Sequence, residues 1–444
     1  MARKRLIASL LICSMLVVLL ASCSGKAPQE QSSSSQSVTS AASSAAGESS
    51  KSGEKAKLLI YHYMGEMADY LNSFCEKFNS EHPDIELSTE LQKDSSTLQI
   101  KYAAGEDPDI VFGAASQKYI DLGKYLDFTP HTDWLDRVAP VMKQLFTDVK
   151  TGGIYKLPMG RGFTGVFYNK QIFDEAGIQP ADTWDKFIEN LKAVKKAKPD
   201  IIPFYIVSND YFNMTQYGPY AHKTLDLGIV EMKKAVSTND KAALDWGKSG
   251  GYIETFGQKL LDMKAAGLID SELALTSTQE MLSEAFATGK VAATITGTFW
   301  SGPLLRQFPD VAKFIGVAPL PSLDGRGGYV GSSSDSAVSM SAVSKYRDQI
   351  FTVVDYLFKP ENLKSYCSAR RVACSFNDVQ ITDWSPIAGQ IQDLWAKYPN
   401  IAAPDIPTGF PTSEWSKLGQ ELIVGTYDAK KYAQTFNEKW NAAY

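Results

Sequence analysis

Lys57-Leu58-Leu59-Ile60-Tyr61 opens the stretch of sequence that decides the fold. This short apolar run is typical of a buried strand, and apolar residues at helical spacing follow over residues 70–78. Residues 85–91 alternate like a strand, residues 98–104 form a short helical pattern, and Asp109-Ile110-Val111-Phe112 is another buried apolar run. The order strand, helix, strand, helix, strand predicts parallel pairing with right-handed crossovers, and therefore an α/β fold.

Short loops follow the predicted strands at the edge of the sheet where ligands bind. In open α/β sheets the ligand lies beyond the carboxyl ends of the strands. The first and third predicted strands end at Tyr63-Met64-Gly65 and at residues 113–117. Two later predicted strands end at residues 208–211 and 297–300. We expect binding residues among these four loops.

The N-terminus has the pattern of a secretory signal. Arg3-Lys4-Arg5 is followed by an apolar run from Leu6 to Ala21, and Leu20-Ala21-Ser22-Cys23 resembles a bacterial lipobox. We predict that residues 1–22 are removed and that Cys23 carries a lipid, which anchors the protein outside the cell membrane. The alternative is an uncleaved membrane anchor, but the apolar run is shorter than the roughly 20 residues of a helical span.

Residues 23–56 are predicted to form a disordered tether. The segment is rich in Ser, Ala, Gln, Gly, Glu and Lys and has no aromatic residue, so it cannot bury enough apolar area to offset its ordering entropy. The chain after Lys57 is too long for one small core, which favours two lobes. Loss of Arg3-Lys4-Arg5 with the signal lowers the net charge from −5 to −8, which argues against a nucleic-acid partner.

The cysteines give little further information. Cys75 falls in a helical pattern and is predicted to be a small core residue. Cys367 and Cys374 are seven residues apart, which places them about 10 Å apart in a continuous helix. That distance is too long for a disulfide, so a bridge between them requires a break in the helix.

Several short motifs follow one another in a characteristic order. They are Ala103-Ala104-Gly105-Glu106-Asp107-Pro108-Asp109-Ile110, Tyr155-Lys156-Leu157-Pro158 with Tyr168-Asn169-Lys170, Pro180-Ala181-Asp182-Thr183-Trp184, residues 286–300, and Gly316-Val317-Ala318-Pro319-Leu320-Pro321. In order and spacing they resemble the extracellular solute-binding proteins of ABC importers, specifically the sugar-binding group that includes the maltose-binding protein.

The resemblance implies a two-lobed, periplasmic-binding-protein-like fold. Each lobe is built from discontinuous segments, and the lobes are joined by a hinge and close on a solute between them. We place the first lobe at residues 57–161 plus 335–378 and the second at residues 162–334 plus 379–444. Hinges are a few loop positions that absorb backbone rotation, and the glycine-rich stretch 160–165 flanks one predicted crossing.

Aromatic platforms are the first requirement of a sugar site, because sugars present apolar C–H faces. Trp300 follows a predicted strand and a glycine, and it matches a stacking tryptophan of the resembled family. Trp415 matches another stacking tryptophan, and Tyr63 lies just beyond the first strand. Such a platform contributes about 1 kcal/mol beyond its buried area. The alternative role for each ring is packing.

Polar groups for sugar hydroxyls are the second requirement. The candidates lie at predicted strand ends and at the crossings between lobes, and they are Ser116, Gln117, Arg161, Asn209, Asp210, Tyr211, Ser333, Ser334 and Asp335. Ser116 and Gln117 stand where the maltose binder has charged contacts, which indicates either a different sugar or a different register of the two sequences. Arg161 is able to reach hydroxyls or a carboxylate, and its alternative role is a solvated or hinge ion pair.

The leading hypothesis is a lipid-tethered, monomeric receptor that binds a carbohydrate and delivers it to the permease of an ABC transporter. Alternatives are a non-sugar solute, delivery to a membrane sensor kinase, and a surface enzyme acting on polysaccharide. The sequence has no Gly-x-Ser-x-Gly elbow, His-Glu-x-x-His helix, phosphate loop or metal-spaced Cys/His cluster. We therefore predict no catalytic residue, no metal and no cofactor.

Overall fold

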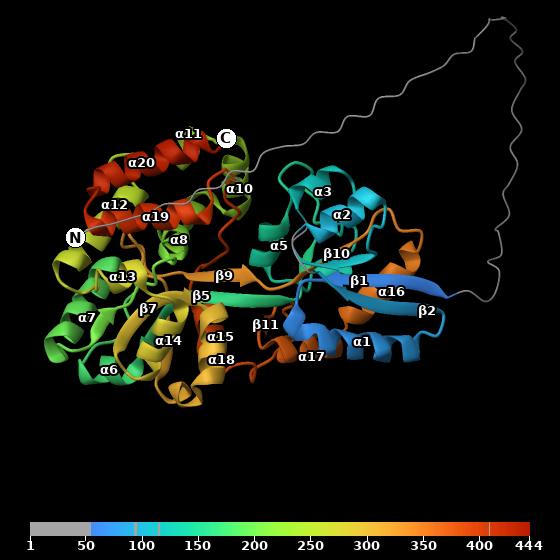
Figure 1. Ribbon diagram of the computed structural model, residues 1–444, viewed down its shortest axis with the longest axis horizontal. Helices are drawn as coiled ribbons and strands as arrows, with labels where there is room; N and C mark the ends of the chain where they lie inside the picture. Colours follow the sequence, from blue (N-terminus) through green and yellow to red (C-terminus); the bar gives the residue numbers. More distant parts are fainter. Residues whose placement is uncertain (1–54, 93–95, 114–115, 408) are drawn as a thin grey trace, which may run out of the picture. The chain divides into compact units, whose positions relative to one another are not determined.

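The structure is a computed structural model that describes residues 55–92, 96–113, 116–407 and 409–444 (Figure 1). The predicted signal, Cys23 and nearly all of the predicted tether lie outside the described residues. Within the described part of the chain, no helix is long and apolar enough to cross a membrane. The strands form two separate sheets.

The first sheet has the strand order β2-β1-β3-β10-β4. Its strands are β1 (Ala56–His62), β2 (Ile85–Leu91), β3 (Ile110–Phe112), β4 (Leu157–Pro158) and β10 (Ala337–Met340). β1 pairs in parallel with both β2 and β3, which confirms the predicted strand–helix–strand pattern, and β10 joins β3 in the antiparallel sense. β3 and β10, which are far apart in the sequence, are therefore neighbours in this sheet.

Seven α-helices and one 3₁₀ turn accompany this sheet in the sequence. They are η1 (Gly65–Met67), α1 (Ala68–Glu81), α2 (Thr97–Ala104), α3 (Gln117–Asp121), α4 (Thr132–Leu135), α5 (Pro140–Phe146), α16 (Arg347–Leu357) and α17 (Pro360–Arg370). α1 buries Leu71, Phe74, Cys75 and Phe78, which lie at helical spacing on one face. Cys75 is thus a core residue, as predicted.

The second sheet is organised around one long strand. Its strands are β5 (Gly160–Asn169), β6 (Ile202–Phe204), β7 (Val291–Gly297), β8 (Ile315–Ala318), β9 (Val330–Ser334), β11 (Ala373–Cys374) and β12 (Asn400–Ile401). β5 pairs with β7, β8, β9 and β11, all in the antiparallel sense. The chain passes between the sheets just before β5 and just after β9, where the glycine-rich crossing was expected. The exact lobe limits stay a prediction.

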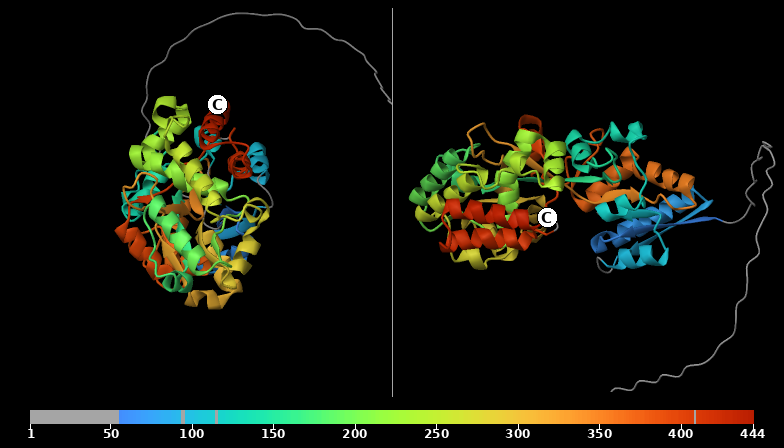
Figure 2. Two further views of the ribbon diagram at one scale, coloured as in Figure 1. Left: turned by 90° about the vertical axis from the view of Figure 1, so that its left-hand side faces the viewer. Right: turned by 90° about the horizontal axis from the view of Figure 1, so that it is seen from above.

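The remaining helices belong to the sequence around the second sheet. They are α6 (Lys170–Glu175), α7 (Trp184–Ala197), α8 (Tyr211–Thr215), η2 (Gln216–Tyr220), α9 (Ala221–Leu227), α10 (Ile229–Thr238), α11 (Lys241–Leu244), α12 (Tyr252–Ala265), α13 (Leu273–Thr276), α14 (Gln279–Ala287), α15 (Thr298–Gln307), η3 (Pro309–Lys313), α18 (Ala388–Lys397), α19 (Thr412–Val424) and α20 (Ala429–Ala442). Thr183 caps α7 through its side chain, as its position before the helix predicts. The C-terminal helices α19 and α20 lie side by side, as Figure 1 and Figure 2 both show.

The break that a Cys367–Cys374 bridge requires is present. α17 ends at Arg370, and Arg371 adopts a left-handed backbone conformation with φ of 58°, which turns the chain back. Both sulfur atoms then lie near the same carbonyl oxygen of Met159, at 3.5 Å for Cys367 and 3.6 Å for Cys374. The two cysteines are free thiols in this structure.

Candidate functional site

Trp300 is a core residue in this structure. Only 3% of its surface is exposed, and its ring meets Phe286 and Phe167 edge-to-face at centroid distances of 5.4 and 5.6 Å. Its indole nitrogen donates a hydrogen bond to Ser283 Oγ at 3.1 Å. No face of the ring is left for a ligand, so the geometry supports the packing role and not the predicted sugar platform.

Trp415 also packs in the core. It is completely buried, and it forms a cluster with Phe410, Phe436 and Tyr220 at centroid distances of 5.1 to 5.8 Å. The physical reason is that α19 turns this side chain toward α20 rather than toward solvent. The structure therefore gives the second predicted platform a packing role as well.

The loop after β6 separates the three candidates that follow it. Asn209 is exposed, whereas Tyr211 is completely buried and belongs to the core. Asp210 is also buried, and its carboxylate accepts hydrogen bonds from the amides of Asn213 (3.1 Å) and Gln279 (2.8 Å). Burial raises the pKa of Asp210 to about 6 despite these bonds. Of the three, Asn209 alone presents its side chain to solvent.

Ser116 and Gln117 lie at the start of α3, and both are exposed. The Gln117 amide nitrogen donates to carboxylate oxygens of Asp121 and Asp148, each at 2.8 Å. Gln117 thus has a local structural role, while Ser116 makes no capping bond to the helix.

Gly162 allows three polar groups to come together where β5 begins. It pairs with Ser333 of β9, and a Cβ at this position would lie 2.4 Å from Ser333 Oγ and 3.1 Å from Thr298 Oγ1. Thr298 Oγ1 in turn accepts the backbone N–H of Phe163 at 3.1 Å. Only glycine fits here, and its small size brings the hydroxyls of two different strands' ends beside β5.

Phe299 is an exposed aromatic ring that the sequence motifs did not single out. It follows Thr298 directly, 55% of its surface is exposed, and its ring lies over Gly297, where a Cβ would come within 2.6 Å of it. Phe299 and Trp300 are successive residues at a helix start and point about 100° apart, so the two rings meet different surroundings. The motif alone did not indicate which ring is buried.

Tyr63 and Asp335 lie at the other end of the same region. Tyr63 is 49% exposed, and its hydroxyl is 3.3 Å from Ser336 Oγ. Asp335 accepts hydrogen bonds from Tyr366 (3.1 Å) and from Arg370 Nε (3.1 Å), and its backbone N–H donates to the Gly160 carbonyl at 2.9 Å. The predicted aromatic residue Tyr63 and the predicted acid Asp335 are thus both held next to the crossing.

We call this group the hinge cluster: Tyr63, Glu66, Phe299, Ser333, Asp335 and Arg370. Glu66 forms an ion pair with Arg370, which links the loop after β1 to α17. Ser333 is half-buried. Ser334 is exposed, but it is the cross-strand partner of Arg161, so its side chain lies on the other face of the sheet and outside the cluster. The cluster combines two exposed rings, the Ser333 hydroxyl and an ion-paired set of charges, which together offer flat apolar faces and both donors and acceptors.

Arg161 lies on the other side of β5 from Ser333. Side chains alternate along a strand, so Arg161 and Gly162 face opposite ways. The Arg161 guanidinium stacks on the Trp395 ring at 3.8 Å from its centroid, and Nε donates to Ser332 Oγ at 3.0 Å. The structure therefore does not bring Arg161 together with the hinge cluster, and it gives the residue no hinge ion pair.

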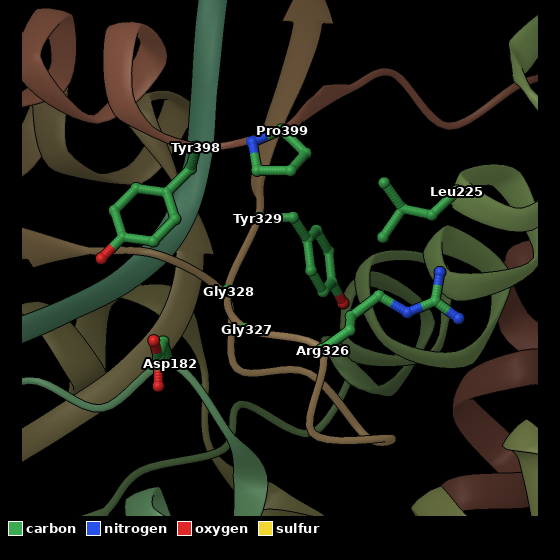
Figure 3. Close-up of a pocket in the computed structure, with 8 residues that line it drawn as sticks. All are labelled: Asp182, Leu225, Arg326, Gly327, Gly328, Tyr329, Tyr398 and Pro399. Atoms are coloured by element: carbon green, nitrogen blue, oxygen red, sulfur yellow. The ribbon is translucent and has the colours of Figure 1, made fainter.

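The smaller of two hollows on the described surface has its charges satisfied internally. It has a volume of about 250 Å³, and Figure 3 shows its lining residues Asp182, Leu225, Arg326, Gly327, Gly328, Tyr329, Tyr398 and Pro399. Arg326 forms ion pairs with Asp226 and Asp324. No group of three or more metal-ligating side chains occurs among the residues that the structure describes.

The chain is similar to known proteins over most of its length. A family model described as bacterial extracellular solute-binding protein matches residues 64–364. A melibiose/raffinose/stachyose-binding protein, MelE, of Bacillus subtilis is 27% identical over 282 residues, which are 62% of this chain and 64% of that relative's length. A multiple sugar-binding protein of Streptococcus mutans is 22% identical over 336 residues, covering 72% of this chain and 74% of its own.

A solved structure gives the same result for the fold. The structure of RafE from Streptococcus pneumoniae, in its apo form, superposes with a TM-score of 0.72 at 20% identity, covering 88% of this chain and 99% of that chain. The predicted two-lobed α/β fold is confirmed.

Proposed function

Because the chain belongs to the bacterial extracellular solute-binding protein family, as its motifs predict, we propose that it is the carbohydrate-binding component of an ABC importer. Membership of a family of binding proteins also confirms the prediction of a binding module over an enzyme. The ligand class rests on two supports, the names of similar proteins and the chemistry of the hinge cluster.

The exposed rings of Phe299 and Tyr63 are the observation that carries the sugar assignment. An aromatic ring left half exposed beside hydroxyls and charges is a surface on which the C–H face of a pyranose stacks while its hydroxyls are hydrogen-bonded. Relatives named for melibiose, raffinose, stachyose and multiple sugars favour an oligosaccharide. Micromolar affinity corresponds to about 8 kcal/mol, which two platforms and several hydrogen bonds can supply.

The setting of the receptor is proposed from the N-terminal sequence. Cys23 carries the lipid anchor, and the tether predicted for residues 23–56 ends at residue 55, because Ala56 belongs to β1. The folded part works outside the cell membrane, where it meets the permease as a monomer. Replacement of Cys23 with alanine releases the protein from the membrane fraction into the medium. Retention of that variant in the membrane would overturn the anchor assignment.

Thermal unfolding of the full chain against a panel of sugars tests the ligand class. The panel holds melibiose, raffinose, stachyose, maltose and glucose, with spermidine and phosphate as non-sugar solutes. A ligand at one hundred times its Kd stabilises the folded state by about 2.7 kcal/mol. We expect stabilisation by one sugar series; stabilisation by spermidine or phosphate alone would sink the carbohydrate assignment while leaving the fold intact.

A further inference from the structure

The larger of the two hollows lies on the Arg161 side of β5. Its volume is about 570 Å³, which is within the range of small-molecule sites. It is lined by residues from the start of α5, from β5, from the loop before α18, and from α18 and β12: Ala139, Pro140, Val141, Gln144, Arg161, Asn377, Gln380, Gln392, Trp395, Ala396 and Asn400. The hinge cluster contributes none of these residues.

Arg161 is the charged residue of this hollow, and it has no carboxylate partner. Apart from the bond from Nε to Ser332 and the stack on Trp395, it makes no hydrogen bond or ion pair with any residue that the structure describes. Burial lowers the pKa of Arg161 to about 10, and no neighbouring acid acts to raise it. A buried guanidinium without a counter-charge is unfavourable unless something pairs with it.

Other partly buried arginines in the described chain show what is missing. Arg137 and Arg370 each form an ion pair with at least one carboxylate. Asp378, which neighbours a lining residue of the hollow, is already held by Arg137 Nε at 2.8 Å. The terminal nitrogens of Arg161 therefore remain available as a planar pair of donors, which matches a carboxylate in the bidentate manner.

The rest of the lining is neutral and suited to hydroxyl groups. The amide-bearing residues are Gln144, Asn377, Gln380, Gln392 and Asn400. Amides both donate and accept hydrogen bonds. Gln380 Nε2 already donates to the Asn377 carbonyl, Gln392 Nε2 donates to the Ile381 carbonyl, and Asn400 Oδ1 accepts from Ser332. The remaining donor and acceptor positions of these amides are the ones open to ligand hydroxyls. A single positive charge is neutralised by one carboxylate, whereas a phosphate monoester carries about −1.5 to −2 charges at pH 7 and would leave negative charge uncompensated.

From this geometry we infer that the hollow is a second ligand site, separate from the hinge cluster, that takes a small hydroxylated monocarboxylate such as a hexuronate. The carboxylate pairs with Arg161, and the hydroxyls bind the surrounding amides. The inference does not depend on the hinge cluster binding a sugar.

Isothermal titration of the full chain with glucuronate, glucose and inorganic phosphate tests the proposal. We expect glucuronate to bind, glucose to bind at least tenfold more weakly in this hollow, and phosphate not to compete. Arg161→Gln should weaken glucuronate binding at least tenfold. Arg326→Gln is the matched control, since it removes an arginine from the smaller hollow, and it should leave glucuronate binding unchanged.

A second variant of the lining tests the site independently if Arg161→Gln does not fold. Gln144→Met keeps the volume of a side chain on α5 and removes its amide, and it should weaken glucuronate binding severalfold. Absence of glucuronate binding to the wild-type chain, equal binding by Arg161→Gln, or binding of phosphate in place of glucuronate would each overturn the proposal. Binding of the oligosaccharide panel is read separately in every variant, so failure of one site is distinguishable from failure of the other.

Discussion

Replacing Trp300 with alanine should open a cavity in the core rather than remove a sugar contact. The ring is 3% exposed and packed against two phenylalanines, and its nitrogen is hydrogen-bonded to Ser283. Truncation of a buried tryptophan to alanine lowers the free energy of unfolding by about 3–5 kcal/mol. The lost hydrogen bond adds about 1 kcal/mol because Ser283 loses its partner in a buried position.

The neighbouring variant, Phe299→Ala, should behave in the opposite way. Its ring is 55% exposed, so we expect its removal to change the free energy of unfolding by less than about 1 kcal/mol. If the ring is a platform, its loss weakens sugar binding by about 1 kcal/mol or more, a factor of at least about 5 in Kd.

Chemical denaturation without ligand and calorimetric titration with the stabilising sugar measure the two effects on the same preparations. We expect Trp300→Ala to lose stability and, where folded, to bind sugar normally, while Phe299→Ala stays stable and binds weakly. A stable Trp300→Ala variant that no longer binds, beside a Phe299→Ala variant that binds like the wild type, would refute this reasoning. The platform would then be Trp300, as the motif predicts.

Three further predictions concern buried groups. Burial raises the pKa of Asp210 to about 6, so its protonation should stabilise the folded state by up to about 3 kcal/mol as pH falls from about 6 to 4. Urea titrations across that range should show that Asp210→Asn lacks this gain in the free energy of unfolding. The same pH dependence of the free energy of unfolding in the variant and the wild type would contradict the prediction. Gly419→Ala should lower the free energy of unfolding by about 1–3 kcal/mol, because the added Cβ would lie 2.3 Å from the buried Tyr211 ring. Alanine favours helices over glycine, so without the clash the urea midpoint should rise, and such a rise would be evidence against it. Iodoacetamide should modify Cys374 before the buried Cys367, because a hydrogen bond from Cys367 lowers the pKa of the Cys374 thiol. Mass spectrometry of the labelled peptides over time shows which thiol reacts first.

Local patterns in the sequence were sufficient for β1, β2 and β3 of the first sheet, but they did not predict β4 or the antiparallel β10. The apolar run at residues 57–61 and the alternation at 85–91 correspond to β1 and β2. The pattern of apolar and polar side chains along a strand depends on which of its faces are buried, so it can be recognised from the sequence of the strand alone. Asp109 has a structural role: its carboxylate accepts the Leu59 N–H at 2.9 Å and the Ser344 hydroxyl at 2.6 Å. The family could also be identified from motifs, since their order along the chain is a property of sequence alone.

What sequence could not determine was the direction in which a side chain points when two choices are locally equivalent. Phe299 and Trp300 are adjacent aromatics at a helix start, and the packing of Phe286 and Phe167 decides which one is buried. Arg161 is on the opposite side of β5 from Ser333 because of strand register, which depends on pairing with a strand some 170 residues later. Contacts between distant segments are not encoded in any short window, so these assignments required the tertiary structure.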